Sequence, residues 1–191
     1  MIDRREALQR IGWMLGGTLS ASTIAGVLGG CSAPPEGVAF AARTLTDGRD
    51  ELVAVLAELI IPETDTPGAR AARVHEFADA MLTDWYEAEE TARFLEGLRQ
   101  VQRRAEAAGG APFNELTEAL QVELLTQMEE EAHQWQEAGR QGDEPFFFTI
   151  KSFTLFGYYT SEIGATQELR VNPMGEYNGD VPYEEIGRSW A

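Results

Sequence analysis

The residues of this sequence that could carry out chemistry are two histidines and a few acidic residues. His133 follows Glu130 by three residues, and this Glu-x-x-His spacing is half of the ligand pattern of di-iron carboxylate bundles. The second copy that such a site requires is missing. His75 and Glu162 could serve as an acid–base pair, but no spacing links them, and the sequence contains no nucleophile elbow or Gly-rich phosphate loop. We therefore predict no catalytic residue, cofactor site or metal site in this chain.

Amphipathic helices would have to position these residues. Apolar side chains recur every three or four positions along most of the sequence, which is the spacing of a helix with one buried face. Pro62 ends the first such segment, Gly109 and Gly110 end the third, and Thr117 is expected to cap the fourth. The predicted helices cover residues 50–61, 74–85, 87–108, 117 to about 139, and 145–159. Strand signals are nearly absent.

The last predicted helix differs from the others in its density of aromatic residues. It begins at Pro145, and proline is favourable at the first helical position. Phenylalanine and tyrosine then occur on all sides of the segment up to Tyr159. We therefore expect a central helix that is buried on every side.

The C-terminal 28 residues have a different character, because no periodicity survives after Gly164. Proline and glycine alternate there with Tyr177, Tyr183 and Trp190, so the segment either wraps its own domain or lies on a partner. The predicted fold is all-α: a single-domain bundle of about five helices with an irregular, aromatic-rich C-terminal tail.

Composition excludes several classes of function. The chain has 191 residues, which suits one compact domain, and 43% of them are hydrophobic. Its net charge of -17 argues against a nucleic-acid partner, because phosphate binding needs clustered Lys and Arg. A single cysteine excludes an intramolecular disulfide, a CxxC zinc site and a CxxCH haem attachment.

The N-terminus has the features of an export signal. Arg4 and Arg5 precede a weakly apolar, Gly-rich stretch at residues 11–30. Paired arginines before such a stretch are typical of a twin-arginine signal, whose machinery carries folded proteins. The alternative is a membrane-spanning helix, but its glycines and hydroxyl residues make it a poor lipid-facing segment. We predict a signal peptide at residues 1–30.

Cys31 lies where this signal ends. The sequence LGGC at residues 28–31 resembles a bacterial lipobox, in which the cysteine is lipidated after cleavage. Such an anchor buries many methylene groups at about 0.8 kcal/mol each. The alternative is an incidental or buried cysteine. We predict a tether at residues 31–45, a domain at residues 46–191, and a periplasmic lipoprotein held on the membrane by its lipid anchor.

Two segments have distinctive sequences that a generic helical bundle would not need. The first is the loop IPETDTPGA at residues 61–69 followed by VHEF at 74–77, and the second is GYYTSEIGAT at 157–166. Together with NGDVPY at 178–183 and RSWA at 188–191, they resemble the gluconate 2-dehydrogenase subunit 3 family. The resemblance covers roughly residues 46–191.

The resemblance implies an accessory subunit without catalytic residues. In such complexes the large subunit is a flavoprotein of the glucose-methanol-choline type, which carries FAD and oxidises a sugar or sugar acid, and a cytochrome c subunit often takes the electrons. The small subunit is thought to carry the export signal and to support folding of the large one. The candidate interface residues are Pro62, Glu63, Asp65, His75, Glu162, Tyr177, Tyr183 and Trp190.

Other functions stay open at this point. The chain could be an independent carbohydrate-active enzyme that uses His75 and Glu162, or a periplasmic lipoprotein with a structural role. Structural and interface roles are equally compatible with Glu63, Asp65, His75 and Glu162, whereas Thr64 and Thr66 are expected to form caps and turns.

Overall fold

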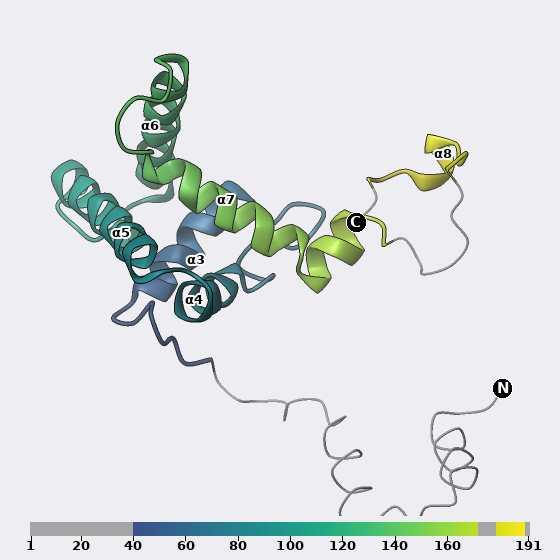
Figure 1. Ribbon diagram of the computed structural model, residues 1–191, viewed down its shortest axis with the longest axis horizontal. Helices are drawn as coiled ribbons and strands as arrows, with labels where there is room; N and C mark the ends of the chain where they lie inside the picture. Colours follow the sequence, from purple (N-terminus) through teal and green to yellow (C-terminus); the bar gives the residue numbers. More distant parts are fainter. Residues whose placement is uncertain (1–39, 172–178, 190–191) are drawn as a thin grey trace, which may run out of the picture. The chain divides into compact units, whose positions relative to one another are not determined.

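The computed structural model describes residues 40–171 and 179–189. Within these ranges the chain forms helices and no strand, as the sequence predicts (Figure 1). Arg4, Arg5, Cys31, Tyr177 and Trp190 lie outside the described residues, so the signal, the lipid anchor and part of the tail stay predictions. No helix in the described part of the chain is long and apolar enough to cross a membrane.

Five long helices make up the fold, and each lies close to a predicted segment. They are α3 (Arg49–Ile60), α4 (Val74–Asp84), α5 (Ala88–Gly109), α6 (Glu118–Glu137) and α7 (Phe146–Tyr159). Three short elements complete the described residues: a 3-10 turn, η1 (Phe113–Glu115), a π-helical turn, η2 (Gly164–Glu168), and α8 (Tyr183–Ile186). The prediction of an all-α fold is therefore confirmed.

The helix ends follow local rules with two differences. Gly110 takes a left-handed conformation with φ 69° after α5, which glycine adopts without strain. Glu87 and Glu90 form a reciprocal capping box at the start of α5. Thr117 does occupy the N-cap position of α6, but its side chain forms no cap hydrogen bond. Pro145 lies at the N-cap of α7 and not at the first helical position.

Helix α7 is central, because it contacts α3, α4, α5, α6 and η2 (Figure 1). Its side chains Phe147, Ile150 and Phe153 belong to the main hydrophobic core. The expectation that α7 is buried on every side is nevertheless wrong, since Phe156 is 59% exposed and Tyr159 is 39% exposed. The outer face of this aromatic helix is open.

A buried carboxylate fixes the chain where it enters α3. Asp79 of α4 is 1% exposed, and its oxygens accept hydrogen bonds from the backbone N–H groups of Arg43 (3.0 Å), Thr44 (2.8 Å) and Leu45 (2.7 Å). The Arg43 guanidinium also binds Asp84 at 2.9 and 2.7 Å. Burial raises the pKa of Asp79, but the three N–H donors and Arg43 outweigh it and hold this pKa below its ordinary value of 3.8.

Candidate partner interface

The loop between α3 and α4 is held by a glutamate that the sequence analysis missed. Glu58 accepts hydrogen bonds from the backbone N–H groups of Glu63 (2.9 Å) and Arg70 (2.8 Å), so one carboxylate joins the two sides of the loop. A Cβ at Gly68 would lie 2.3 Å from Glu58 Oε1 and 2.6 Å from the Glu63 nitrogen. Glycine is therefore required here by the close approach of the carboxylate and the backbone.

The two distinctive segments of the sequence meet in space. Tyr158 of α7 is 1% exposed, and its hydroxyl donates a hydrogen bond to the Pro67 carbonyl at 2.9 Å. The Thr66 hydroxyl donates to Glu168 Oε2 at 2.9 Å. Where α7 passes α4, a Cβ at Gly157 would lie 2.8 Å from the Phe77 ring. We call this contact between the 61–69 loop and the end of α7 the loop–helix joint.

Three predicted interface residues lie at the exposed tip of this joint. Pro62, Glu63 and Asp65 are exposed, while the neighbouring Gly68 and Ala69 are buried. A second hydrophobic cluster beneath the tip is formed by Ala57, Ala69, Val74 and Tyr158. The joint thus presents a polar tip on a buried, hydrogen-bonded base.

His75 and Glu162 occupy different surroundings. His75 lies in the first turn of α4, with Nε2 3.8 Å from Glu76 Oε1. Burial lowers the pKa of His75 below 6.5, although Glu76 and Asp50 act to raise it, so the imidazole is neutral at pH 7. Its charged neighbours are residues of α3, α4 and the loop before α4, whereas Glu162 is exposed after α7 and is not among them. The geometry does not support an acid–base pair.

His133 lies on a solvated face of α6. Its Nε2 is 3.9 Å from Glu129, which also accepts a hydrogen bond from Lys151 at 3.0 Å. Within residues 40–171 and 179–189, no group of three or more His, Cys, Asp or Glu side chains is arranged to hold a metal ion. Glu130 is exposed beside them.

The described end of the tail returns to its own chain. The Arg170 backbone N–H donates to the Ser189 carbonyl at 2.8 Å, and its guanidinium donates to the Glu185 carbonyl at 2.7 Å. The Arg188 guanidinium contacts the Gln167 carbonyl. Residues 185–189 therefore lie on the segment after η2. Tyr183 begins α8.

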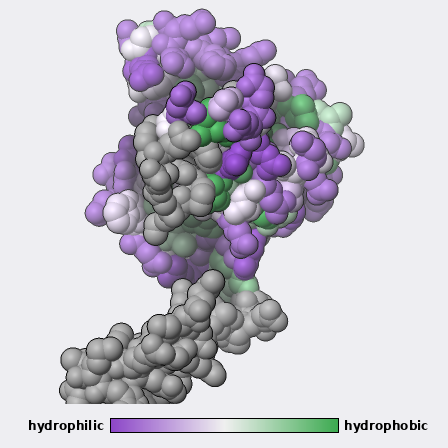
Figure 2. All heavy atoms as spheres, turned by 90° about the vertical axis from the view of Figure 1, so that its right-hand side faces the viewer, coloured by the Kyte–Doolittle hydropathy of each residue, from purple (hydrophilic) through white to green (hydrophobic). Residues whose placement is uncertain are grey.

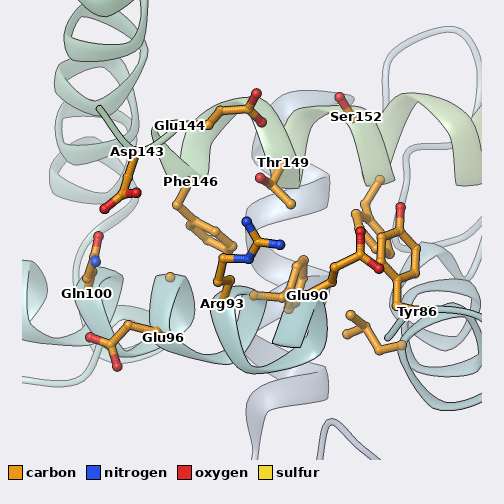
Figure 3. Close-up of a pocket in the computed structure, with 14 residues that line it drawn as sticks. Tyr86, Glu90, Arg93, Glu96, Gln100, Asp143, Glu144, Phe146, Thr149 and Ser152 are labelled. Atoms are coloured by element: carbon orange, nitrogen blue, oxygen red, sulfur yellow. The ribbon is translucent and has the colours of Figure 1, made fainter. Parts of the chain in front are cut away.

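A groove between α5 and α7 was not predicted from the sequence. Its volume is about 540 Å³, and Tyr86, Phe94, Phe146 and Phe153 supply its aromatic surface (Figure 3). A Cβ at Gly97 would lie 2.0 Å from the Phe146 ring, so this glycine lets the ring lie directly on α5. Gly97 in the middle of a long helix is the one signal that could have indicated this close approach.

The groove carries charges that stay unpaired. Arg93 points from α5 toward α7, and Asp143 and Glu144 lie in the loop just before α7 (Figure 3). Within the described residues, none of these three side chains forms an ion pair or a hydrogen bond. By contrast, Glu96 at the outer edge is held by Arg99 and Arg103, and these bonds lower its pKa.

These observations define a helical protein whose distinctive segments build a structural joint beside open surfaces. Residues 47–179 match the family model described as gluconate 2-dehydrogenase subunit 3, and the chain therefore belongs to this family. It is thus an accessory subunit of a dehydrogenase complex. The match includes both sides of the loop–helix joint and ends before the last 12 residues. Comparisons with curated proteins and with solved structures gave no significant match.

Proposed function

We propose that this chain is the non-catalytic small, gamma-type subunit of a periplasmic flavin-dependent dehydrogenase that oxidises a sugar or sugar acid. It supports the folding and twin-arginine export of a large flavoprotein subunit of the glucose-methanol-choline type. That partner carries FAD and the catalytic residues, and a cytochrome c subunit accepts the electrons. The export signal is Arg4 and Arg5 with the stretch after them, and Cys31 carries the lipid anchor.

The loop–helix joint is the observation that carries this proposal. The two segments most typical of the family contact each other through the Tyr158 hydroxyl and the Pro67 carbonyl, and Thr66 binds Glu168, two residues beyond the second segment. Their polar side chains therefore serve to hold a loop in place. This arrangement suits the binding of a partner, because the exposed residues Pro62, Glu63 and Asp65 are held on a fixed base.

Co-purification tests the proposal. The full chain with a C-terminal affinity tag is purified from its own host under mild detergent. We expect a second polypeptide in a fixed ratio, with the absorption spectrum of oxidised flavin and with sugar dehydrogenase activity. A colourless, active single chain would instead support the independent carbohydrate-active enzyme.

The export and anchoring parts of the proposal are tested separately. Replacing both Arg4 and Arg5 with lysine should keep this chain and the flavoprotein in the cytoplasm, because the translocase reads the paired guanidinium groups. Cys31→Ala should leave export intact and release the protein from the membrane. Normal export of the first variant, or membrane retention of the second, would contradict the corresponding part.

The 62–68 loop and the tail are the proposed contacts with the flavoprotein. Deletion of residues 176–191 should leave the helical circular dichroism nearly unchanged, because the five long helices end before this segment. We expect the same deletion to abolish co-purification and export of the flavoprotein. A collapsed bundle with the partner still exported would show that the tail belongs to the domain's own core.

A further inference from the structure

The open face of α7 continues the α5–α7 groove. Thr149, Ser152 and Phe153 line the groove, and Phe156 lies one helical turn beyond them on the same side of α7. Phe156 packs against Phe77 of α4, with ring centroids 5.6 Å apart, yet it is 59% exposed. We call the groove together with Phe156 and the neighbouring Trp85 the α7 track.

Large apolar side chains stand exposed along this track. Trp85, directly before the groove residue Tyr86, is 77% exposed, and Phe156 is 59% exposed. On the face seen in Figure 2, separate hydrophobic patches lie between hydrophilic residues. Tryptophan, tyrosine and phenylalanine are residue types that anchor protein interfaces. An apolar track of this kind marks a binding surface.

The charges along the track indicate what kind of partner it fits. Asp143, Glu144 and Glu90 face the groove against one cation, Arg93, and neither Asp143 nor Glu144 is neutralised by another described residue. The whole chain has a net charge of -17. A basic segment is therefore attracted, while the anionic surface of a bilayer is repelled.

The length of the track suits a helix. Helix α7 has 14 residues, which corresponds to about 21 Å at 1.5 Å per residue. A helix of similar length in the groove would place apolar anchors at positions i, i+3 or i+4, and i+7 against Tyr86, Phe146 and Phe156. Lys or Arg on its flanks would meet Asp143 and Glu144, and one acidic residue would meet Arg93.

We propose that the α7 track binds an amphipathic, basic helix of the flavoprotein subunit. This inference rests on the proposed function and adds a contact surface separate from the 62–68 loop and the tail. The aromatic side chains provide the apolar contact, and the unpaired carboxylates fix the orientation of the bound helix.

Photo-cross-linking in the complex tests the surface directly. The full chain carrying a benzophenone amino acid in place of Phe156 is expressed in its own host and irradiated, with the same group in place of Val122 as the control. Val122 is an exposed apolar residue of α6, 46% exposed, outside the track. We expect the label at 156 to cross-link to a Lys- or Arg-containing helical segment of the flavoprotein, and the label at 122 to give no such product.

The outcomes distinguish a failure of the α7 track proposal from a failure of the proposed function. If the wild-type chain co-purifies with the flavoprotein but the label at 156 reacts with a second copy of this chain, with lipid, or with nothing, the track proposal is wrong and the proposed function stands. If no flavoprotein co-purifies with the wild-type chain, both are wrong.

A charge exchange tests the electrostatic part of the inference. Asp143→Lys with Glu144→Lys should weaken the complex at least tenfold, measured as the Kd between the tagged chain and the purified flavoprotein at low salt. The control Glu123→Lys with Glu130→Lys makes the same charge change on exposed positions of α6 and should change the Kd less than twofold. Equal effects of the two double variants on the Kd would show that only the total charge matters. The proposal that Asp143 and Glu144 orient a bound helix would then be wrong.

Discussion

The loop–helix joint and the α7 track use the same aromatic helix in opposite ways. In the joint, Tyr158 is buried and its hydroxyl is hydrogen-bonded to Pro67. In the track, Phe156 is two residues away on the other side of α7 and remains exposed. One helix thus stabilises the fold through its inner face and leaves aromatic surface on its outer face. Fully buried side chains such as Tyr158 stabilise the fold, whereas large apolar side chains that stay exposed, such as Phe156, indicate a binding surface.

The largest expected effect is on the joint. Tyr158→Ala removes a fully buried aromatic side chain and should lower the free energy of unfolding by about 3–5 kcal/mol in urea denaturation. The neighbouring Tyr159→Ala, at a 39% exposed position, should lower it by about 1 kcal/mol or less. Similar losses for the two variants would break the distinction between an inner and an outer face.

Acid should lower the free energy of unfolding in part by protonating Asp79. Its pKa is below 3.8 in the folded protein, so its contribution to stability is present above pH 3.8 and is lost as the pH falls through the folded value. Asp79→Asn should cost about 2–3 kcal/mol at pH 7, because the three backbone N–H groups lose a charged acceptor.

The measurement is the free energy of unfolding between pH 7 and pH 3. The variant should show a smaller decrease on acidification than the wild type, since Glu51, Asp84, Glu96 and Glu131, whose pKa values are also lowered, still contribute. An identical decrease in both proteins would show that Asp79 does not contribute to the loss of stability in acid.

A smaller loss is expected from Gly68→Ala. The new methyl group would meet Glu58 Oε1 and the Glu63 backbone, which should cost about 1–3 kcal/mol in urea unfolding. In a Glu58→Ala background part of this clash is absent, so the two changes should cost less together than the sum of their separate effects. Strict additivity would mean that the carboxylate does not press on Gly68.

The smallest effect on stability is expected in the track. Trp85→Ser should change the free energy of unfolding by about 0.5 kcal/mol or less, because the indole is 77% exposed. The same variant should reduce the yield of flavoprotein in the co-purification. A large loss of stability would show that Trp85 holds the bundle together.

The fold could be predicted from local sequence signals. The apolar periodicity and punctuation at Pro62 and Gly110 place helix ends within a few residues of those observed, because capping and helix termination depend on neighbouring residues. The burial of α7 was predicted less well. Composition shows that the helix is aromatic, but which of its sides meet other helices is decided by residues far away in the sequence.

The site was predicted only in part. The two distinctive segments were found, but their contact joins residues 91 positions apart, Pro67 and Tyr158, which no spacing reveals. Glu58 and Arg93 were missed because each has the sequence context of an ordinary surface charge, and Asp79 was missed as well. Asp79 did offer a signal: it precedes the buried Leu82 by three residues and so lies on the inner face of α4.

The Asp79 clamp also has a mechanical consequence. A pull on the chain ahead of Arg43 is resisted at Arg43, Thr44 and Leu45, whose N–H groups all converge on one carboxylate of α4. Several bonds that share one anchor must break together, so the load passes to the middle of a packed helix and the chain end does not peel away bond by bond. A protein tethered upstream of this point would therefore resist stretching until α4 itself is displaced.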